Sequence, residues 1–81
     1  MAEHKKPVII YGGSFDPPHR GHLELAAAAL RQLRPAALYF VPGFLTPFKE
    51  FSPAPYSGRR AMLRAALAAA GLGNRAEVKI R

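Results

Sequence analysis

The sequence contains no cysteine, and only five of its 81 residues are acidic against twelve lysines and arginines. Without cysteine, a disulfide framework, a thiolate metal site and a cysteine nucleophile are excluded, and a reducing compartment is favoured. The longest uncharged apolar stretch, Leu38 to Phe48, is well short of the roughly 20 residues that cross a membrane. Met1 to Lys6 is polar and lacks the apolar core of a secretory signal. We therefore expect a cytoplasmic protein with no membrane partner.

The excess of basic residues gives a net charge of +7 with the histidines neutral. Hydrophobic residues make up 49% and charged residues 21% of the chain, which excludes a disordered tail. A charge of this sign attracts anions, and nucleic acid, acidic membranes and phosphorylated metabolites all qualify. Charge alone does not choose among them.

Three short apolar runs, rich in β-branched and aromatic residues, predict β-strands at residues 8–11, 38–41 and 78–80. The first two show no alternation of polar and apolar residues, so we expect them to be buried on both faces of a sheet.

Helical periodicity predicts a helix over residues 22–33, ending before Pro35, and a second over 58–70, with Ser57 as N-cap and Gly71 as the stop. The residues of the two apolar stripes are Leu23, Ala26, Ala27, Leu30 and Leu33, and Met62, Leu63, Ala66, Leu67 and Ala70. The second helix also carries Arg59, Arg60 and Arg64 on another side, which we expect to be a solvated face.

Strands that alternate with helices in the order β-α-β-α-β predict an α/β fold with a parallel sheet, one half of a doubly wound, Rossmann-like domain. We assign residues 1–81 to this single domain. The proline-rich segment Pro42 to Pro55 is too long for a plain connection and is interpreted as a substrate loop.

The residues with chemical potential follow the first strand, in the run Gly12-Gly13-Ser14-Phe15-Asp16-Pro17-Pro18-His19-Arg20-Gly21-His22. Glycines there let the backbone approach a ligand, and the start of the following helix favours a phosphate. His19 and His22 are three residues apart, so both can direct donors at one phosphate group. Taken singly, these residues also fit a tight turn and a helix cap. The ordered combination is more specific.

This run resembles the His-x-Gly-His nucleotidyltransferases and, more closely, the bacterial nicotinate-nucleotide adenylyltransferase family. The similarity continues through Phe40-Val41-Pro42, Pro47-Phe48-Lys49 and Arg60-x-Met62-Leu63. Phe48 stands where the family usually has a histidine that contacts substrate. Members of the family are more than twice as long and carry a carboxyl-terminal Ser-Ser/Thr-x-Arg motif that nothing after Gly71 resembles. We therefore expect a domain that is incomplete at its carboxyl end.

The resemblance implies adenylyl transfer from ATP to nicotinate mononucleotide, giving deamido-NAD and pyrophosphate. It implies that His19 and His22 are the catalytic residues that contact the ATP phosphates. Mg²⁺ would bridge phosphate oxygens rather than occupy a protein cage. Asp16 is interpreted as a turn residue rather than a Mg²⁺ ligand. The other residues expected to bind ATP or substrate are Gly12, Gly13, Ser14, Phe15, Lys49 and Arg60.

Two alternatives remain open from the sequence. One keeps adenylyl transfer but uses another acceptor, such as phosphopantetheine, against which His19 and the glycine pair argue. The other is a basic module that binds nucleic acid, but its arginines are not interleaved with aromatic residues as stacking platforms require. If the domain is incomplete, Val8 to Tyr11 forms an unpaired apolar edge through which the chain self-associates, and the isolated chain binds ATP weakly.

Overall fold

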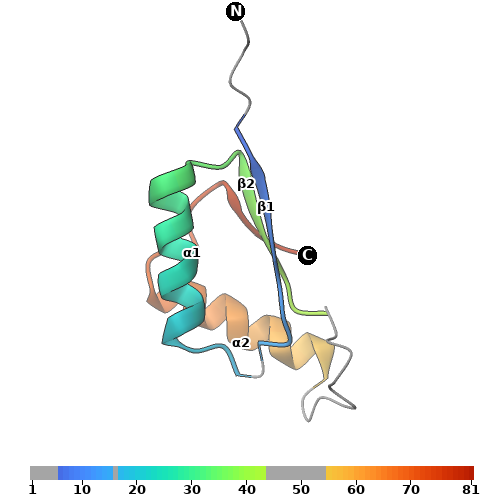
Figure 1. The fold of residues 1–81 in the computed structure, drawn as a ribbon. Coiled ribbons are helices and arrows are strands. Elements are labelled where there is room, and N and C mark those ends of the chain that lie inside the picture. Colours follow the sequence, from blue (N-terminus) through green and yellow to red (C-terminus); the bar gives the residue numbers. More distant parts are fainter. Residues whose placement is uncertain (1–5, 16, 44–54) are drawn as a thin grey trace, which may run out of the picture.

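The computed structural model describes residues 6–15, 17–43 and 55–81. Within these residues the elements follow the predicted order (Figure 1): β1 (Val8–Gly12), α1 (Arg20–Leu33), β2 (Ala37–Val41), α2 (Tyr56–Ala69) and β3 (Val78–Ile80). The strands form one parallel sheet in the order β1-β2-β3. The predicted β-α-β-α-β half of a Rossmann-like fold is confirmed, and β1 lies at an edge of this sheet. None of the described helices is long and apolar enough to cross a membrane.

The parallel register brings the carboxyl ends of β1 and β2 to the same end of the sheet. Val8 pairs with Ala37 at one end of the ladder, and Gly12 pairs with Val41 at the other. The beginning of α1 and the whole of α2 lie near this carboxyl end, which is the lower end in Figure 1. In open α/β sheets ligands bind beyond the carboxyl ends of the strands, so this end is where a site is expected.

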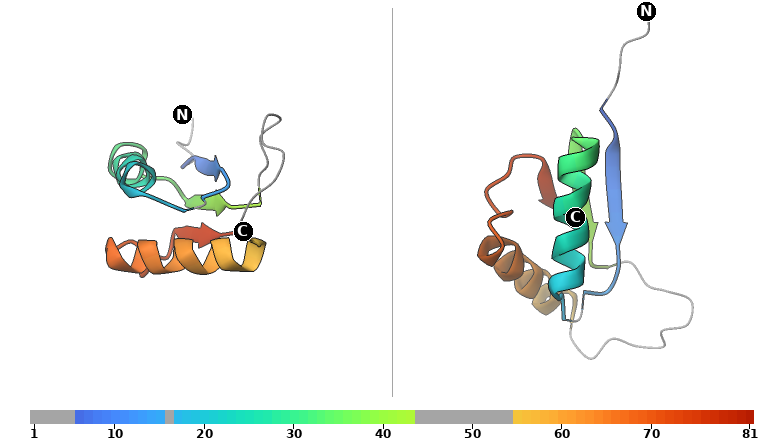
Figure 2. Two further views of the ribbon diagram at one scale, coloured as in Figure 1. Left: turned by 90° about the horizontal axis from the view of Figure 1, so that it is seen from below. Right: turned by 60° about the vertical axis from the view of Figure 1, so that its left-hand side comes forward.

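The hydrophobic core lies between the sheet and the helices. Helix α1 covers one face of the sheet, whereas α2 runs past β3, on the side away from β1 (Figure 2). The core centres on Leu38 and Phe40 of β2, which are fully buried. Its other buried members are Phe15, Ala26, Leu30, Leu63, Leu67 and Leu72.

The opposite face of the sheet carries no helix in the described part of the chain (Figure 2). Val8 and Ile10 of β1 are 58% and 67% exposed, and they alternate with half-buried residues. The prediction that this strand is buried on both faces is therefore wrong for the described residues. Apolar side chains on both faces of a strand indicate only that it is suited to being covered on both sides. On the uncovered face a hollow of about 330 Å³ is lined by Ile10, Tyr39, Val41 and Arg81.

Helix boundaries differ slightly from those expected. Helix α2 begins at Tyr56, with Pro55 rather than Ser57 as N-cap, because the extended backbone of Pro55 lets its carbonyl accept the first helical hydrogen bond from Arg59 (3.0 Å). Leu33 is 55% exposed and lies outside the core, contrary to the predicted stripe, because α1 ends there. The stop at Gly71 is confirmed, with a positive φ of 77° directly after the C-cap Ala70.

Candidate functional site

The glycine turn, which we define as residues Gly12 to Phe15, lies where β1 ends beside β2. Gly12 is the last residue of β1, and the amide of Gly13 donates to the Val41 carbonyl (3.3 Å), which extends the ladder by one bond. A Cβ on Gly13 would lie 3.4 Å from the Phe15 ring. The turn is therefore compact, and its backbone lies at the ligand-binding end of the sheet.

Phe15 combines a strained backbone with a buried ring. Its φ is +49°, a left-handed conformation that costs a bulky residue about 1–2 kcal/mol. Its side chain is 2% exposed, and its ring centroid lies 5.3 Å from that of Tyr11, 4.9 Å from His22 and 5.5 Å from Phe40. The aromatic packing holds the strained turn in place and encloses the Phe15 ring, so this side chain serves the core rather than a ligand.

His19 and His22 lie together at the start of α1, as the sequence predicted. Their rings are stacked, with centroids 3.9 Å apart and an interplanar angle of 25°. His19 is the N-cap of the helix and is exposed, whereas His22 is half-buried and packs edge-on against Phe15 and Tyr11. The first turn of α1 contains no acidic residue, so the positive end of the helix dipole is not neutralised from within that turn.

His22 also closes the start of the helix, so the cap interpretation and the ligand interpretation are both compatible with its position. Its Nδ1 accepts a hydrogen bond from the backbone N–H of His19 (3.0 Å). Burial lowers the pKa of His22, and the charge of His19 lowers that pKa further. A neutral ring that accepts at Nδ1 carries its proton on Nε2. His22 is therefore fixed as a donor through Nε2.

Arg59 is the functional candidate that the sequence analysis missed. The expectation of a solvated face is wrong for this residue, which is 6% exposed. Its Nη1 donates to the carbonyl of Pro42 (2.6 Å) and, over 3.5 Å, to that of Ser14. A signal was present, because Arg59 precedes the buried Leu63 by four residues and so lies on the same helical stripe.

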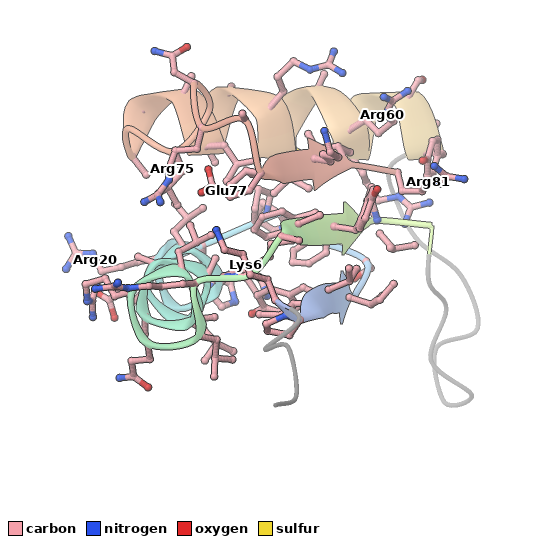
Figure 3. The ribbon with its side chains drawn as sticks, turned by 90° about the horizontal axis from the view of Figure 1, so that it is seen from above. Lys6, Arg20, Arg60, Arg75, Glu77 and Arg81 are labelled. Atoms are coloured by element: carbon pink, nitrogen blue, oxygen red, sulfur yellow. The ribbon has the colours of Figure 1, made fainter. Side chains whose placement is uncertain are left out.

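The remaining predicted ligand residues are Arg60 and Lys49. In Figure 3 the label of Arg60 lies on the same side of the view as that of Arg81, and Arg20, the neighbour of His19, lies on the opposite side. Its guanidinium carbon is 6.0 Å from the centre of the Tyr56 ring. Lys49, Asp16, Phe48 and most of the predicted substrate loop lie outside the described residues. The described residues contain no group of three or more histidines and carboxylates that fits a metal ion.

A groove of about 610 Å³ borders His19 between α1 and α2. It is lined by Pro18, His19, Arg20, Leu23, Glu24, Ala27, Ala66, Ala69, Ala70 and Leu72. Most of these side chains are apolar, and the glycine turn is not among them. The groove is therefore less suited to a triphosphate than the turn and the histidine pair are.

Comparison with known proteins identifies the family of the chain. Residues 10–80 match the family model described as cytidylyltransferase-like. A probable nicotinate-nucleotide adenylyltransferase of Staphylococcus haemolyticus is 33% identical over 79 residues, 94% of this chain and 40% of the relative. A protein of the same name from Sulfurovum is 46% identical over 53 residues, 64% of this chain and 28% of the relative. A probable nicotinate-nucleotide adenylyltransferase/Ap4A hydrolase of Mycoplasma genitalium is 41% identical over 63 residues, 78% of this chain and 18% of the relative. The chain thus spans at most 40% of these relatives. With the match covering nearly all of its length, the chain belongs to the cytidylyltransferase-like family.

Proposed function

We propose that this chain forms the nucleotide-phosphate site of an enzyme that transfers the adenylyl group of ATP to nicotinate mononucleotide. The products are deamido-NAD and pyrophosphate. The observation that carries the proposal is the stacked pair His19 and His22 at the start of α1, directly after a glycine turn at the carboxyl end of β1. The names of the relatives from Staphylococcus haemolyticus and Sulfurovum supply the acceptor.

In the proposed reaction a phosphate oxygen of the mononucleotide attacks the α-phosphorus of ATP. The bond from that phosphorus to the oxygen bridging it to the β-phosphate breaks, and pyrophosphate leaves with the electron pair. The nucleophile is already anionic near neutral pH, so no general base is needed, and catalysis consists of positioning and charge stabilisation. His22 donates through Nε2 to the reacting phosphate, and His19 donates beside it.

The remaining predicted contacts belong to this proposal. The backbone of Gly12, Gly13, Ser14 and Phe15 lines the nucleotide path, while Lys49 and Arg60 meet substrate phosphates. Mg²⁺ enters as part of the MgATP substrate, and no described residue is assigned to hold it. The absence of cysteine and the soluble substrates favour the cytoplasm as the place of reaction.

Three further expectations concern the isolated chain. We propose that it binds ATP weakly, turns over slowly or not at all, and self-associates through the edge strand β1, whose Val8 and Ile10 are exposed on the uncovered face of the sheet. Nucleic acid is not a partner in this proposal.

The test is a titration with MgATP followed by the ring-proton signals of His19 and His22. Saturable shifts of both rings are expected, and unmoved rings at saturating nucleotide would remove the proposed site. A pyrophosphate-release assay then compares nicotinate mononucleotide, nicotinamide mononucleotide and phosphopantetheine as acceptors. Preference for phosphopantetheine would favour the alternative acceptor. Tight, steeply salt-dependent binding of nucleic acid without any ATP binding would favour the nucleic-acid module.

A further inference from the structure

Arg59 occupies an environment that is unfavourable for a cation. Its side chain is 6% exposed, and its Nε has no hydrogen-bond partner among the described residues. The residue lies in the first turn of α2, at the positive end of the helix dipole. In the described part of the chain no carboxylate forms an ion pair with it. A buried, unpaired charge is costly, so the contacts that the guanidinium does make must offset that cost.

Those contacts join three segments at the carboxyl end of the sheet. One guanidinium nitrogen, Nη1, donates to the carbonyls of Ser14, two residues after β1, and Pro42, one residue after β2. The donor is charged, and its short bond to Pro42 (2.6 Å) is the strong one, whereas the contact with Ser14 (3.5 Å) is long and weaker. Arg59 therefore ties the glycine turn, the end of β2 and the start of α2 to one another.

The start of α2 is itself anchored on the other side. The Tyr56 hydroxyl donates to the carbonyl of Arg81 (2.6 Å), just after β3, and the Arg59 guanidinium carbon lies 5.8 Å from the centre of the Tyr56 ring. The first turn of α2 thus contacts the chain after each of the three described strands. Because Arg59 in the first turn of α2 donates to the Ser14 carbonyl, the position of α2 constrains Ser14 and its neighbour Phe15.

We propose that Arg59 is a positioning residue that holds the Gly13-Ser14-Phe15 turn in its nucleotide-binding conformation. The turn carries backbone groups of the proposed site, and the Phe15 ring packs against the ring of His22. Loss of the guanidinium releases the Ser14 carbonyl, loosens the strained Phe15 backbone and displaces the His22 ring. The consequence for nucleotide binding rests on the proposed function. The effect of Arg59 on the conformation of the turn does not depend on any ligand.

The test compares Arg59→Met and Arg59→Lys with the control Arg64→Met, which changes an exposed arginine of the same helix. Amide hydrogen exchange of Ser14 and Phe15 is measured against that of Leu30 and Leu67 in the helix cores. In Arg59→Met we expect exchange in the turn to rise at least tenfold more than in the helices, and the Kd for MgATP to rise at least tenfold. Arg59→Lys should recover part of both effects, and Arg64→Met should change neither.

The positioning role would be overturned if Arg59→Met raised amide exchange in the turn and in the helices by the same factor. It would also be overturned if the Kd for MgATP did not change. If Arg59→Met does not fold, the same two comparisons decide in Arg59→Lys, which keeps the charge. Selective loosening of the turn in a protein whose wild type does not bind MgATP would refute the proposed function but not the effect of Arg59 on the turn. The two failures are therefore distinguishable.

Discussion

Replacement of His22 by glutamate should separate its capping role from its proposed role as a phosphate donor. Glutamate is a preferred residue three positions after an N-cap, because its carboxylate accepts from the N-cap backbone N–H as the Nδ1 of His22 does. It has no donor when ionised, and it places a negative charge where a phosphate would bind. His22→Ala, in contrast, loses the acceptor and the donor together.

The expected stability difference follows from the contacts of the ring. Both variants lose the edge-on packing of His22 against Phe15 and Tyr11, which is worth about 0.5–1.5 kcal/mol. Only the alanine variant also loses the cap, about 1 kcal/mol, while glutamate gains about 0.3–1 kcal/mol from the helix dipole. We therefore expect His22→Glu to be more stable than His22→Ala by about 1–2 kcal/mol in urea unfolding at pH 7.

MgATP should nevertheless bind more weakly to both variants, with a Kd at least tenfold higher than that of the wild type, because each lacks the Nε2 donor. Isothermal titration on the folded protein gives this value, with Arg64→Met as a variant expected to bind like the wild type. Equal stability of the glutamate and alanine variants would show that the cap contributes nothing. Wild-type affinity in the glutamate variant would show that His22 does not donate to phosphate.

Three other changes test the remaining structural conclusions. Acidification from about pH 6.5 should lower the free energy of unfolding, because burial lowers the pKa of His22 in the folded chain and the unfolded chain then binds the proton more tightly. Urea unfolding between pH 5 and 8 measures how the free energy of unfolding depends on pH. This dependence should be weaker in His22→Ala. A rise in stability on acidification would contradict the prediction. Phe15→Ala should lower the free energy of unfolding by about 3–5 kcal/mol, because it leaves a cavity where the buried ring was. Circular dichroism should therefore show a largely unfolded chain at 25 °C. A folded variant of wild-type stability would contradict the role of Phe15 in the core. Ile10→Lys on the uncovered sheet face should reduce concentration-dependent association in sedimentation velocity with less than about 0.5 kcal/mol change in stability, and undiminished association would exclude this surface.

The element order could be predicted because each strand and helix has a clear local pattern. The run Val8 to Tyr11 is too short and too β-branched for a helix, and Pro35 and Gly71 end the helices by their own backbone preferences. The uncovered face of β1 could not be predicted from the same run, because a strand's composition does not reveal whether another layer covers it.

The candidate site, like the fold, could be predicted only in part. Its glycines could be placed directly after β1 and its histidines at the start of α1, because both assignments depend on local patterns. The role of Arg59 was missed because its partners, Ser14 and Pro42, are distant in sequence and accept through backbone carbonyls, which every residue has. The left-handed backbone conformation of Phe15 could not be predicted either, because a bulky aromatic residue rarely adopts it unless tertiary packing holds it in place.

Fastening one imidazole nitrogen to the main chain limits the chemistry open to His22. A second proton on this ring would displace the bond from the His19 amide, so the side chain is a poor shuttle for protons near neutral pH. A glycosidic or peptide bond, whose cleavage needs an acid and a base in turn, is a poor match for such a group. A displacement between phosphates, in which negative charge migrates and no hydrogen is transferred, matches it well.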